Sequence, residues 1–283
     1  MIAATVLVLL AGSQTPWWDK SVAEALARDP RSRSAWESAL QGLPGTDRAG
    51  VAYLLADLPL SDLSLVTPDA LIANVRLAAS ARAATDWARN VPRDVYLDSV
   101  LPHAVVTEPR DSMRAEFSRR YTPLAKKYDS PGKAALALNK ALFYDYNVVY
   151  NTLRLRTDQS SRESTAQGMA TCTGLSIMLI EACRSIGIPA RLAGIHTWPG
   201  KTGNHTWVEI WDNGWHFVGA AEPDAKGLNH AWFVEQAKTA IENEPLHAIF
   251  AVTYKSTGTY FPLAWNPEAR INAVNVTKRY TAR

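Results

Sequence analysis

The sequence has few of the features that mark metal-binding, nucleic-acid-binding or membrane proteins. Cysteine is scarce: the 283 residues include two, Cys172 and Cys183, and neither belongs to the close Cys or His pairs of a structural zinc site. The 30 Lys and Arg residues nearly balance the 27 Asp and Glu residues, and the net charge of +3 gives no electrostatic case for a nucleic acid. We therefore expect no metal, no cofactor and no nucleic-acid partner.

Long apolar runs are also absent, apart from one at the start. Residues 2–12 have the length of the hydrophobic part of a signal peptide, which is too short to span a bilayer. Ala11, Gly12 and Ser13 offer small residues at a cleavage point, although no Lys or Arg precedes the run. We expect a signal peptide over residues 1–13 and an exported, periplasmic or secreted protein with no stable membrane insertion. The alternative is a short buried helix in a cytoplasmic protein.

The rest of the composition is that of a globular protein with a sizeable core. Hydrophobic residues make up 47% and charged residues 20% of the chain, and the length suggests about two domains. Residues 14–125 are rich in Ala, Leu and Arg, with Pro and Gly at turns, and predict a helical accessory region without a chemical motif. Residues 126–260 predict a second domain that mixes helices and strands, and residues 261–283 a C-terminal tail or the start of a further β domain.

The order of elements after residue 126 predicts an α+β fold. Ser130 and Pro131 indicate the start of a helix, and the polar stretch 157–168 predicts a loop. The cysteine-bearing segment follows, and stretches rich in β-branched and aromatic residues come after it. We expect a helix packed on an antiparallel sheet.

The cysteine segment has the apolar spacing of an α-helix. Its apolar residues recur at offsets of 0, 3, 4, 7, 8 and 11, which places them on one face. Gly187 suits a left-handed cap and Pro189 forbids continuation, so the helix is predicted from about Thr171 to Ile186. The residues of this face are Leu175, Met178, Leu179, Ala182, Cys183 and Ile186.

The same helix separates the two cysteines. Eleven residues of helix rise about 16 Å, whereas a disulfide needs Cα atoms within roughly 7 Å, so the two cannot pair. Cys183 lies in the apolar face and is expected to be a core residue. Cys172 lies in the first turn, where free N–H groups and the helix dipole favour a thiolate and could stabilise an oxyanion.

A partner histidine is expected on a strand. His205 opens a strand-like run, and the residues Asp212, Asn213 and Gly214 predict a hairpin that leads into a second run. His216 lies inside that second run, where a structural role is expected. A sheet packed on the helix could hold the His205 imidazole against the Cys172 thiol.

Three blocks of this region resemble the transglutaminase-like superfamily of papain-like thiol enzymes. They are GMATC at 168–172, GIPAR at 187–191 and NHTWVEI at 204–210, in the family's order and spacing. The resemblance covers roughly residues 130–235. It implies that residues 126–260 form a catalytic domain with a transglutaminase-like core, with Cys172 as nucleophile and His205 as general base and acid.

The third member of the family's triad departs from the pattern. The family usually has Asp-Pro four residues beyond a tryptophan, but four residues after Trp215 the chain has Gly219. Glu222, followed by Pro223, mimics that pair after a small insertion and is the predicted third catalytic residue. Asp224 is the alternative, and both could simply occupy a polar loop. A carboxylate or amide is needed to fix the imidazole tautomer.

Two further features carry open interpretations. Gln167, five residues before Cys172, could donate to an oxyanion or be an ordinary loop residue. Five tryptophans could line a substrate groove, although most are expected to pack the sheet. They are Trp198, Trp207, Trp211, Trp215 and Trp232.

The pattern predicts a cofactor-independent thiol acyl-transfer enzyme. Cys172 would attack an amide of a peptide, protein or glycopeptide, and water rather than an amine would resolve the acyl-enzyme. The alternative is a non-catalytic module of the same fold that binds a peptide or glycan, for which Gly219 is the best support.

Overall fold

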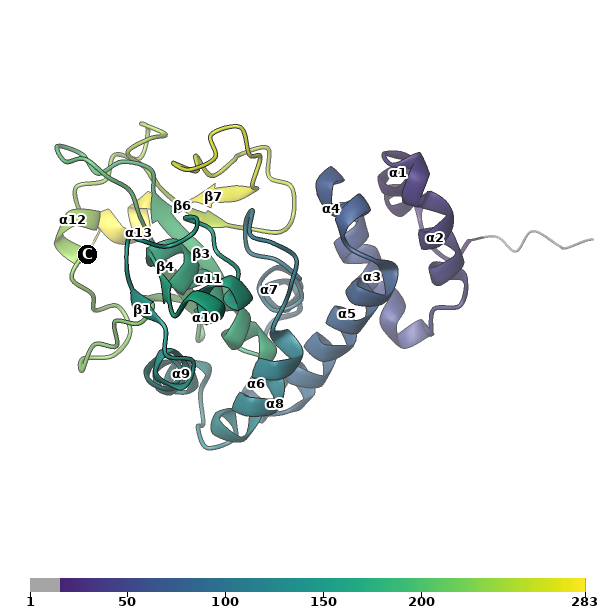
Figure 1. The fold of residues 1–283 in the computed structure, drawn as a ribbon, viewed down its shortest axis with the longest axis horizontal. Coiled ribbons are helices and arrows are strands. Elements are labelled where there is room, and N and C mark those ends of the chain that lie inside the picture. Colours follow the sequence, from purple (N-terminus) through teal and green to yellow (C-terminus); the bar gives the residue numbers. More distant parts are fainter. Residues whose placement is uncertain (1–15, 283) are drawn as a thin grey trace, which may run out of the picture.

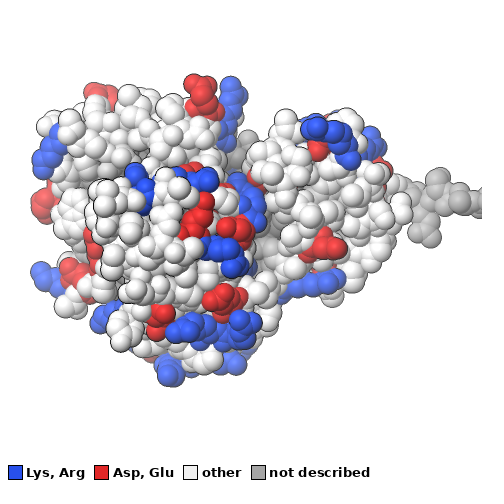
Figure 2. Space-filling view, in the orientation of Figure 1, with Lys and Arg blue, Asp and Glu red and all other residues white. Residues whose placement is uncertain are grey.

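The computed structural model describes residues 16–282. The predicted signal peptide at 1–13 lies outside the described residues. Within 16–282, none of the helices has both the length and the apolar character needed to cross a bilayer. Figure 1 shows a helical part at one end of an elongated molecule and a sheet-containing part at the other. On the face shown in Figure 2, acidic and basic side chains are interspersed, in keeping with the near balance of charge in the sequence.

The first part, here called the helical region, comprises the elements from α1 to α7. Its apolar side chains form a core of their own between Val22 and Leu101. Side-chain caps explain where several helices begin: Asp19 accepts from the amides of Ser21 and Val22, and Thr67 accepts from that of Ala70. The helices are α1 (Lys20–Ala27), α2 (Pro30–Gln41), α3 (Gly45–Ala56), α4 (Leu60–Leu65), α5 (Pro68–Ala83), α6 (Asp86–Arg89) and α7 (Arg93–Ser99).

The second part, here called the α+β region, starts with α8. The sequence analysis placed this helix in the accessory region, but its Phe117 and Tyr121 pack into the same core as α11 and the sheet. The elements up to the sheet are α8 (Arg114–Ala125), α9 (Pro131–Asp145), β1 (Val149–Tyr150), α10 (Ser161–Gln167), β2 (Met169–Ala170) and α11 (Cys172–Ser185). As expected, Ser130 caps α9 and Pro131 is its first residue.

One expectation was wrong. The stretch 157–168, expected to be a loop, contains the helix α10. Ser160 caps this helix by accepting from the amide of Glu163, whose carboxylate accepts in return from the amide of Ser160. This is a capping box, and its S-x-x-E spacing was the sequence signal that could have revealed the helix.

The sheet is antiparallel throughout, with the strand order β5-β4-β3-β6-β7. The predicted hairpin is present, with β4 and β5 joined through Asn213 and Gly214, both at positive φ. The C-terminal residues add β7 to one edge of the sheet, beside β6. The elements are β3 (Ala190–Ile195), β4 (His205–Trp211), β5 (Trp215–Val218), α12 (Val234–Ala237), β6 (Ile249–Val252), β7 (Ala273–Asn275) and α13 (Thr277–Thr281).

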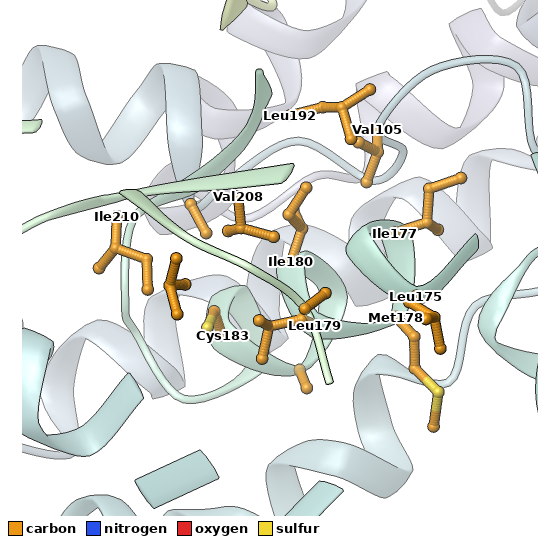
Figure 3. Packing of buried hydrophobic residues seen from close by; sticks show 14 of the residues in the cluster. Val105, Leu175, Ile177, Met178, Leu179, Ile180, Cys183, Leu192, Val208 and Ile210 are labelled. Carbon is orange, nitrogen blue, oxygen red and sulfur yellow. The ribbon is translucent and has the colours of Figure 1, made fainter. Parts of the chain in front are cut away.

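Helix α11 is the centre of the α+β core. It packs against β3 and β4 on one side and against α8 and α9 on another. Figure 3 shows Leu179, Ile180 and Cys183 of this helix among Val208 and Ile210 of the sheet. The predicted bounds of the helix are confirmed within one residue at each end. The α+β fold is therefore confirmed.

The turn after α11 fits closely against the helical region. Gly187 has a φ of 87°, as predicted for a left-handed cap. A Cβ atom at this position would lie 2.7 Å from the carbonyl oxygen of Ala81 in α5, so only glycine fits. The buried Arg114 also joins the two parts, because its guanidinium donates to Asn74 and to the carbonyl of Arg184. The far end of α11 is thereby fixed in place.

Candidate active site

Cys172 is the first residue of α11 and is half-buried. The residue before it, Thr171, is the N-cap but makes no capping hydrogen bond with its side chain. Its hydroxyl instead accepts a 3.0 Å hydrogen bond from Nε of Arg154. Within residues 16–282, the first-turn amides of α11 are therefore not capped by the Thr171 side chain, which suits these donors to an oxyanion.

His205 is the first residue of β4, and it is paired with Ile195 at the end of β3. Its ring lies between aromatic side chains, with centroid distances of 4.8 Å to Trp232 and 4.9 Å to Phe233. The residue is only 7% exposed, and its Nε2 atom has no hydrogen-bond partner among the described residues. Burial lowers the pKa of His205 to about 4, so the ring is neutral at pH 7.

A hydrogen bond joins the two elements that carry these residues. The hydroxyls of Thr173 and Thr206, each one residue beyond its candidate, lie 3.0 Å apart and are buried. Cys172 and His205 both line a cavity of about 240 Å³. The structure therefore brings the predicted nucleophile and the predicted base to one site. The other lining residues are Tyr150, Leu175, Asn204, Thr206, Gly219, Ala220, Glu222 and Trp232.

Glu222 lies beside Gly219, the position at which the resemblance led us to look for an aspartate. Gly219 and Glu222 form an isolated β-bridge just after β5. A Cβ atom built on Gly219 would lie 2.6 Å from Oε2 of Glu222. The carboxylate of Glu222 therefore fills the space into which a side chain at position 219 would project.

The carboxylate of Glu222 interacts with Trp232 in this structure. The indole Nε1 donates a 2.9 Å hydrogen bond to Oε2 of Glu222, and the same indole packs on the His205 ring. Partial burial raises the pKa of Glu222, and the bond from Trp232 only partly offsets this. No hydrogen bond joins Glu222 to His205 anywhere in the part of the chain described here, so the triad contact stays a prediction.

The alternatives to these residues lie elsewhere. Asp224 is absent from the cavity lining, and its Oδ1 accepts from the amide of Lys226. Gln167 is also absent from the lining, and its side-chain carbonyl accepts from the amide of Leu155. His216 is held by Asn229 within the sheet region, as expected of a structural residue.

Two of the five tryptophans and the second cysteine pack the interior. Trp207 is fully buried and Trp198 is 6% exposed, whereas Trp232, which lines the cavity, is 63% exposed. Cys183 is fully buried in the core, and burial raises the pKa of its thiol. The prediction that Cys183 is a core residue is confirmed. Within residues 16–282, no three His, Cys, Asp or Glu side chains are grouped as metal ligands.

The chain is similar to known proteins over part of its length. No curated protein matches the sequence. One similar solved structure is that of a proposed cysteine protease from Cytophaga hutchinsonii, with 15% identity and a TM-score of 0.33 over 57% of this chain and 58% of that one. The chain thus spans less than two thirds of that protein. Residues 119–220, which include Cys172, His205 and Gly219, match the family described as the transglutaminase-like superfamily. The three sequence blocks lie inside this match, so the resemblance is confirmed over residues 119–220.

Proposed function

We propose that this protein is a thiol hydrolase that cleaves an amide bond of a peptide or glycopeptide through an acyl-enzyme on Cys172. One observation carries the proposal: Cys172, His205 and Glu222 line a single cavity, and Cys172 lies in the first turn of a helix whose N-cap side chain leaves the first amides uncapped in the described structure. A nucleophile, a base and oxyanion donors around one space are the parts that acyl transfer needs.

The residues would divide the reaction as follows. His205, neutral at pH 7, takes the proton of the Cys172 thiol while the sulfur bonds to the amide carbon. The first-turn amides of α11 hold the oxyanion, and the C–N bond then breaks as the imidazolium gives its proton to the leaving amine. Water, deprotonated by His205, attacks the thioester, releasing the acid and the free thiol.

Glu222 would support the charged imidazole. Burial disfavours the charged form of both groups, since it raises the pKa of Glu222 and lowers that of His205. Two such groups in one cavity stabilise each other when they ionise together. Nε2 of His205, without a partner in residues 16–282, requires an acceptor once the ring is protonated, and Glu222 is the acidic residue of the described lining. We infer that Glu222 takes the place of the family's aspartate.

The test is turnover with and without the thiol. A panel of peptides, glycopeptides and cell-wall fragments should include substrates that the wild type cleaves and the Cys172→Ser variant does not. Cys183→Ser is the matched control, because it removes the other thiol of the same helix. Cleavage that survives Cys172→Ser would contradict the proposal.

A second candidate, a non-catalytic binding module, is favoured by one observation. Nε2 of His205 has no partner in the described part of the chain, and the Glu222 carboxylate is already bonded to Trp232. A module of this kind would bind peptides equally well as the wild type and as the Cys172→Ser variant, and would turn over none of them. Binding by calorimetry together with the turnover panel separates the two functions.

Export through residues 1–13 is part of the same proposal. Expression of the full chain with a C-terminal tag should give a mature protein that lacks the apolar run. An intact N-terminus found by mass spectrometry would argue for the alternative, a cytoplasmic protein.

A further inference from the structure

The cavity lined by Cys172 and His205 adjoins a second one. A neighbouring cavity of about 380 Å³ shares four lining residues with it. These are Tyr150, Leu175, Ala220 and Glu222. The second cavity extends past them to the end of α9 and the start of β1. These two adjoining cavities, the first of which is lined by the candidate nucleophile, are here together called the groove.

The groove is nearly free of charge, and apolar side chains make up much of its lining. Apart from Cys172 and His205, Glu222 is the one acidic or basic residue in either lining among the described residues. Apolar and aromatic residues dominate the second cavity, and several stand unusually exposed: Tyr144 at 87%, Tyr150 at 60% and Val149 at 57%. Large apolar side chains gathered in the open indicate a binding surface. The absence of Lys and Arg from the described lining disfavours an acidic occupant.

The segment 149–155, which begins with β1 at the groove, is fixed next to Cys172. The strand β2 leads directly into α11, and β1 pairs with β2 in parallel. Arg154 then ties the segment to Thr171, the residue before Cys172. Leu153 and Leu155, on the same segment, are 83% and 64% exposed. The apolar surface is therefore held near the thiol by two independent sets of hydrogen bonds.

The strand β1 has one open edge in the described structure. The amide of Val149 donates to the carbonyl of Gly168, just before β2, at 3.1 Å. The amide of Asn151 donates to the carbonyl of Ala170 in β2 at 2.9 Å. In a strand, the residue between two such donors faces the opposite edge, so the amide and carbonyl of Tyr150 point away from β2. An extended peptide can add to an open edge of this kind through its main chain.

We infer that the substrate is an extended peptide or protein segment with a large apolar or aromatic side chain close to the scissile amide. Its main chain pairs with the open edge of β1 at Tyr150, and its apolar side chain fills the groove beside Tyr144 and Val149. This inference rests on the proposed thiol chemistry of Cys172, and it selects a neutral peptide over an acidic glycopeptide as the substrate class.

The test uses peptidyl chloromethyl ketones that share one scaffold and differ in one residue, Phe, Ala or Asp. Mass spectrometry follows the rate at which each labels Cys172. The Phe probe should label at least about tenfold faster than the Ala probe, because its ring is buried on binding, and the Asp probe should be slowest. N-methylation of the amides that flank Phe should abolish that advantage by blocking main-chain pairing.

The variant Tyr150→Ala should bring the Phe-to-Ala ratio close to one. Because both probes react with the same thiol, a change in the reactivity of that thiol alters both rates equally and leaves the ratio unchanged. Tyr260→Ala is the matched control, since Tyr260 is also exposed but lines neither cavity, and it should leave the ratio unchanged. Equal rates for the three probes, or fastest labelling by the Asp probe, would overturn the inference and leave the thiol chemistry standing. If no probe labels Cys172 faster than it labels free cysteine, the proposed function itself fails.

Discussion

The two ends of helix α11 carry the same functional group in opposite surroundings. At the N-terminal end, the Cys172 thiol lies half-buried in a cavity, beside free amides and near His205. Eleven residues on, the Cys183 thiol is enclosed by the core, and burial raises its pKa. The position of a thiol along this helix therefore decides whether a substrate can reach it, because Cys172 lines a cavity and Cys183 is enclosed by the core.

The largest expected effect comes from exchanging the two thiols for hydroxyls. Cys172→Ser should lower kcat by on the order of 10³-fold or more while leaving the melting curve unchanged. Cys183→Ser should leave kcat unchanged and cost about 1–3 kcal/mol of unfolding free energy, because it places a hydroxyl in an apolar core. Kinetics and urea unfolding on both variants measure this. Loss of activity in Cys183→Ser at unchanged stability would break the comparison.

The next effect concerns the carboxylate near the N-terminal end. Glu222→Gln keeps the shape of the side chain but removes the charge that supports the imidazolium, so kcat should fall by about 10²-fold or more. Asp224→Asn, outside the cavity, should change the rate little. The opposite ranking would move the role to Asp224. No change in either variant would leave a Cys–His pair without a carboxylate.

A smaller effect appears in the pH dependence of stability. The folded protein holds the pKa of His205 at about 4, below the unfolded value of 6.5, because burial disfavours the charged ring. The unfolded chain therefore binds more protons than the folded chain between these two pH values. The contribution of His205 to the unfolding free energy is fully present above pH 6.5 and is lost as the pH drops toward 4. The loss from this group should reach at most about 3 kcal/mol.

The variant His205→Gln isolates this contribution, because glutamine does not titrate. Its unfolding free energy should fall less steeply between pH 6.5 and 4 than that of the wild type, as followed by urea unfolding at each pH. Parallel curves would show that the His205 ring is not held neutral by the fold.

The smallest effect compares two buried hydroxyls on α11. Thr173→Val removes the hydrogen bond to Thr206 near the nucleophile, and Ser185→Ala removes the bond to the carbonyl of Ala182 at the other end. Each should cost about 1 kcal/mol of unfolding free energy. Only Thr173→Val should also lower kcat, because it loosens the contact between α11 and β4. Equal kinetic effects would show that the two ends are not functionally distinct.

The sequence was most informative where spacing reflects geometry. The apolar period from Leu175 to Ile186 predicted α11, and the residues between Trp211 and Trp215 predicted the hairpin. The helix α10 was missed because a polar stretch was interpreted by composition, although its capping box was present.

Tertiary contacts could not be predicted in the same way. The Glu222 carboxylate fills the space beside Gly219 and accepts a hydrogen bond from Trp232. Both contacts depend on the β-bridge between Gly219 and Glu222, and the sequence does not fix the backbone conformation of these residues. The groove beside β1 was missed for a similar reason. Tyr144, Val149 and Leu153 are of residue types that usually pack in a core, and only the structure shows that they are exposed.

The central claim is that Cys172 forms a covalent acyl-enzyme. The most direct measurement is intact-protein and peptide mass spectrometry after rapid acid quenching of the wild type with a cleavable peptide. The account predicts a mass increase equal to the acyl part of the substrate, located on the peptide that contains Cys172 and absent from the Cys172→Ser variant. Turnover with no adduct at any time after mixing, or an adduct on another residue, would contradict it.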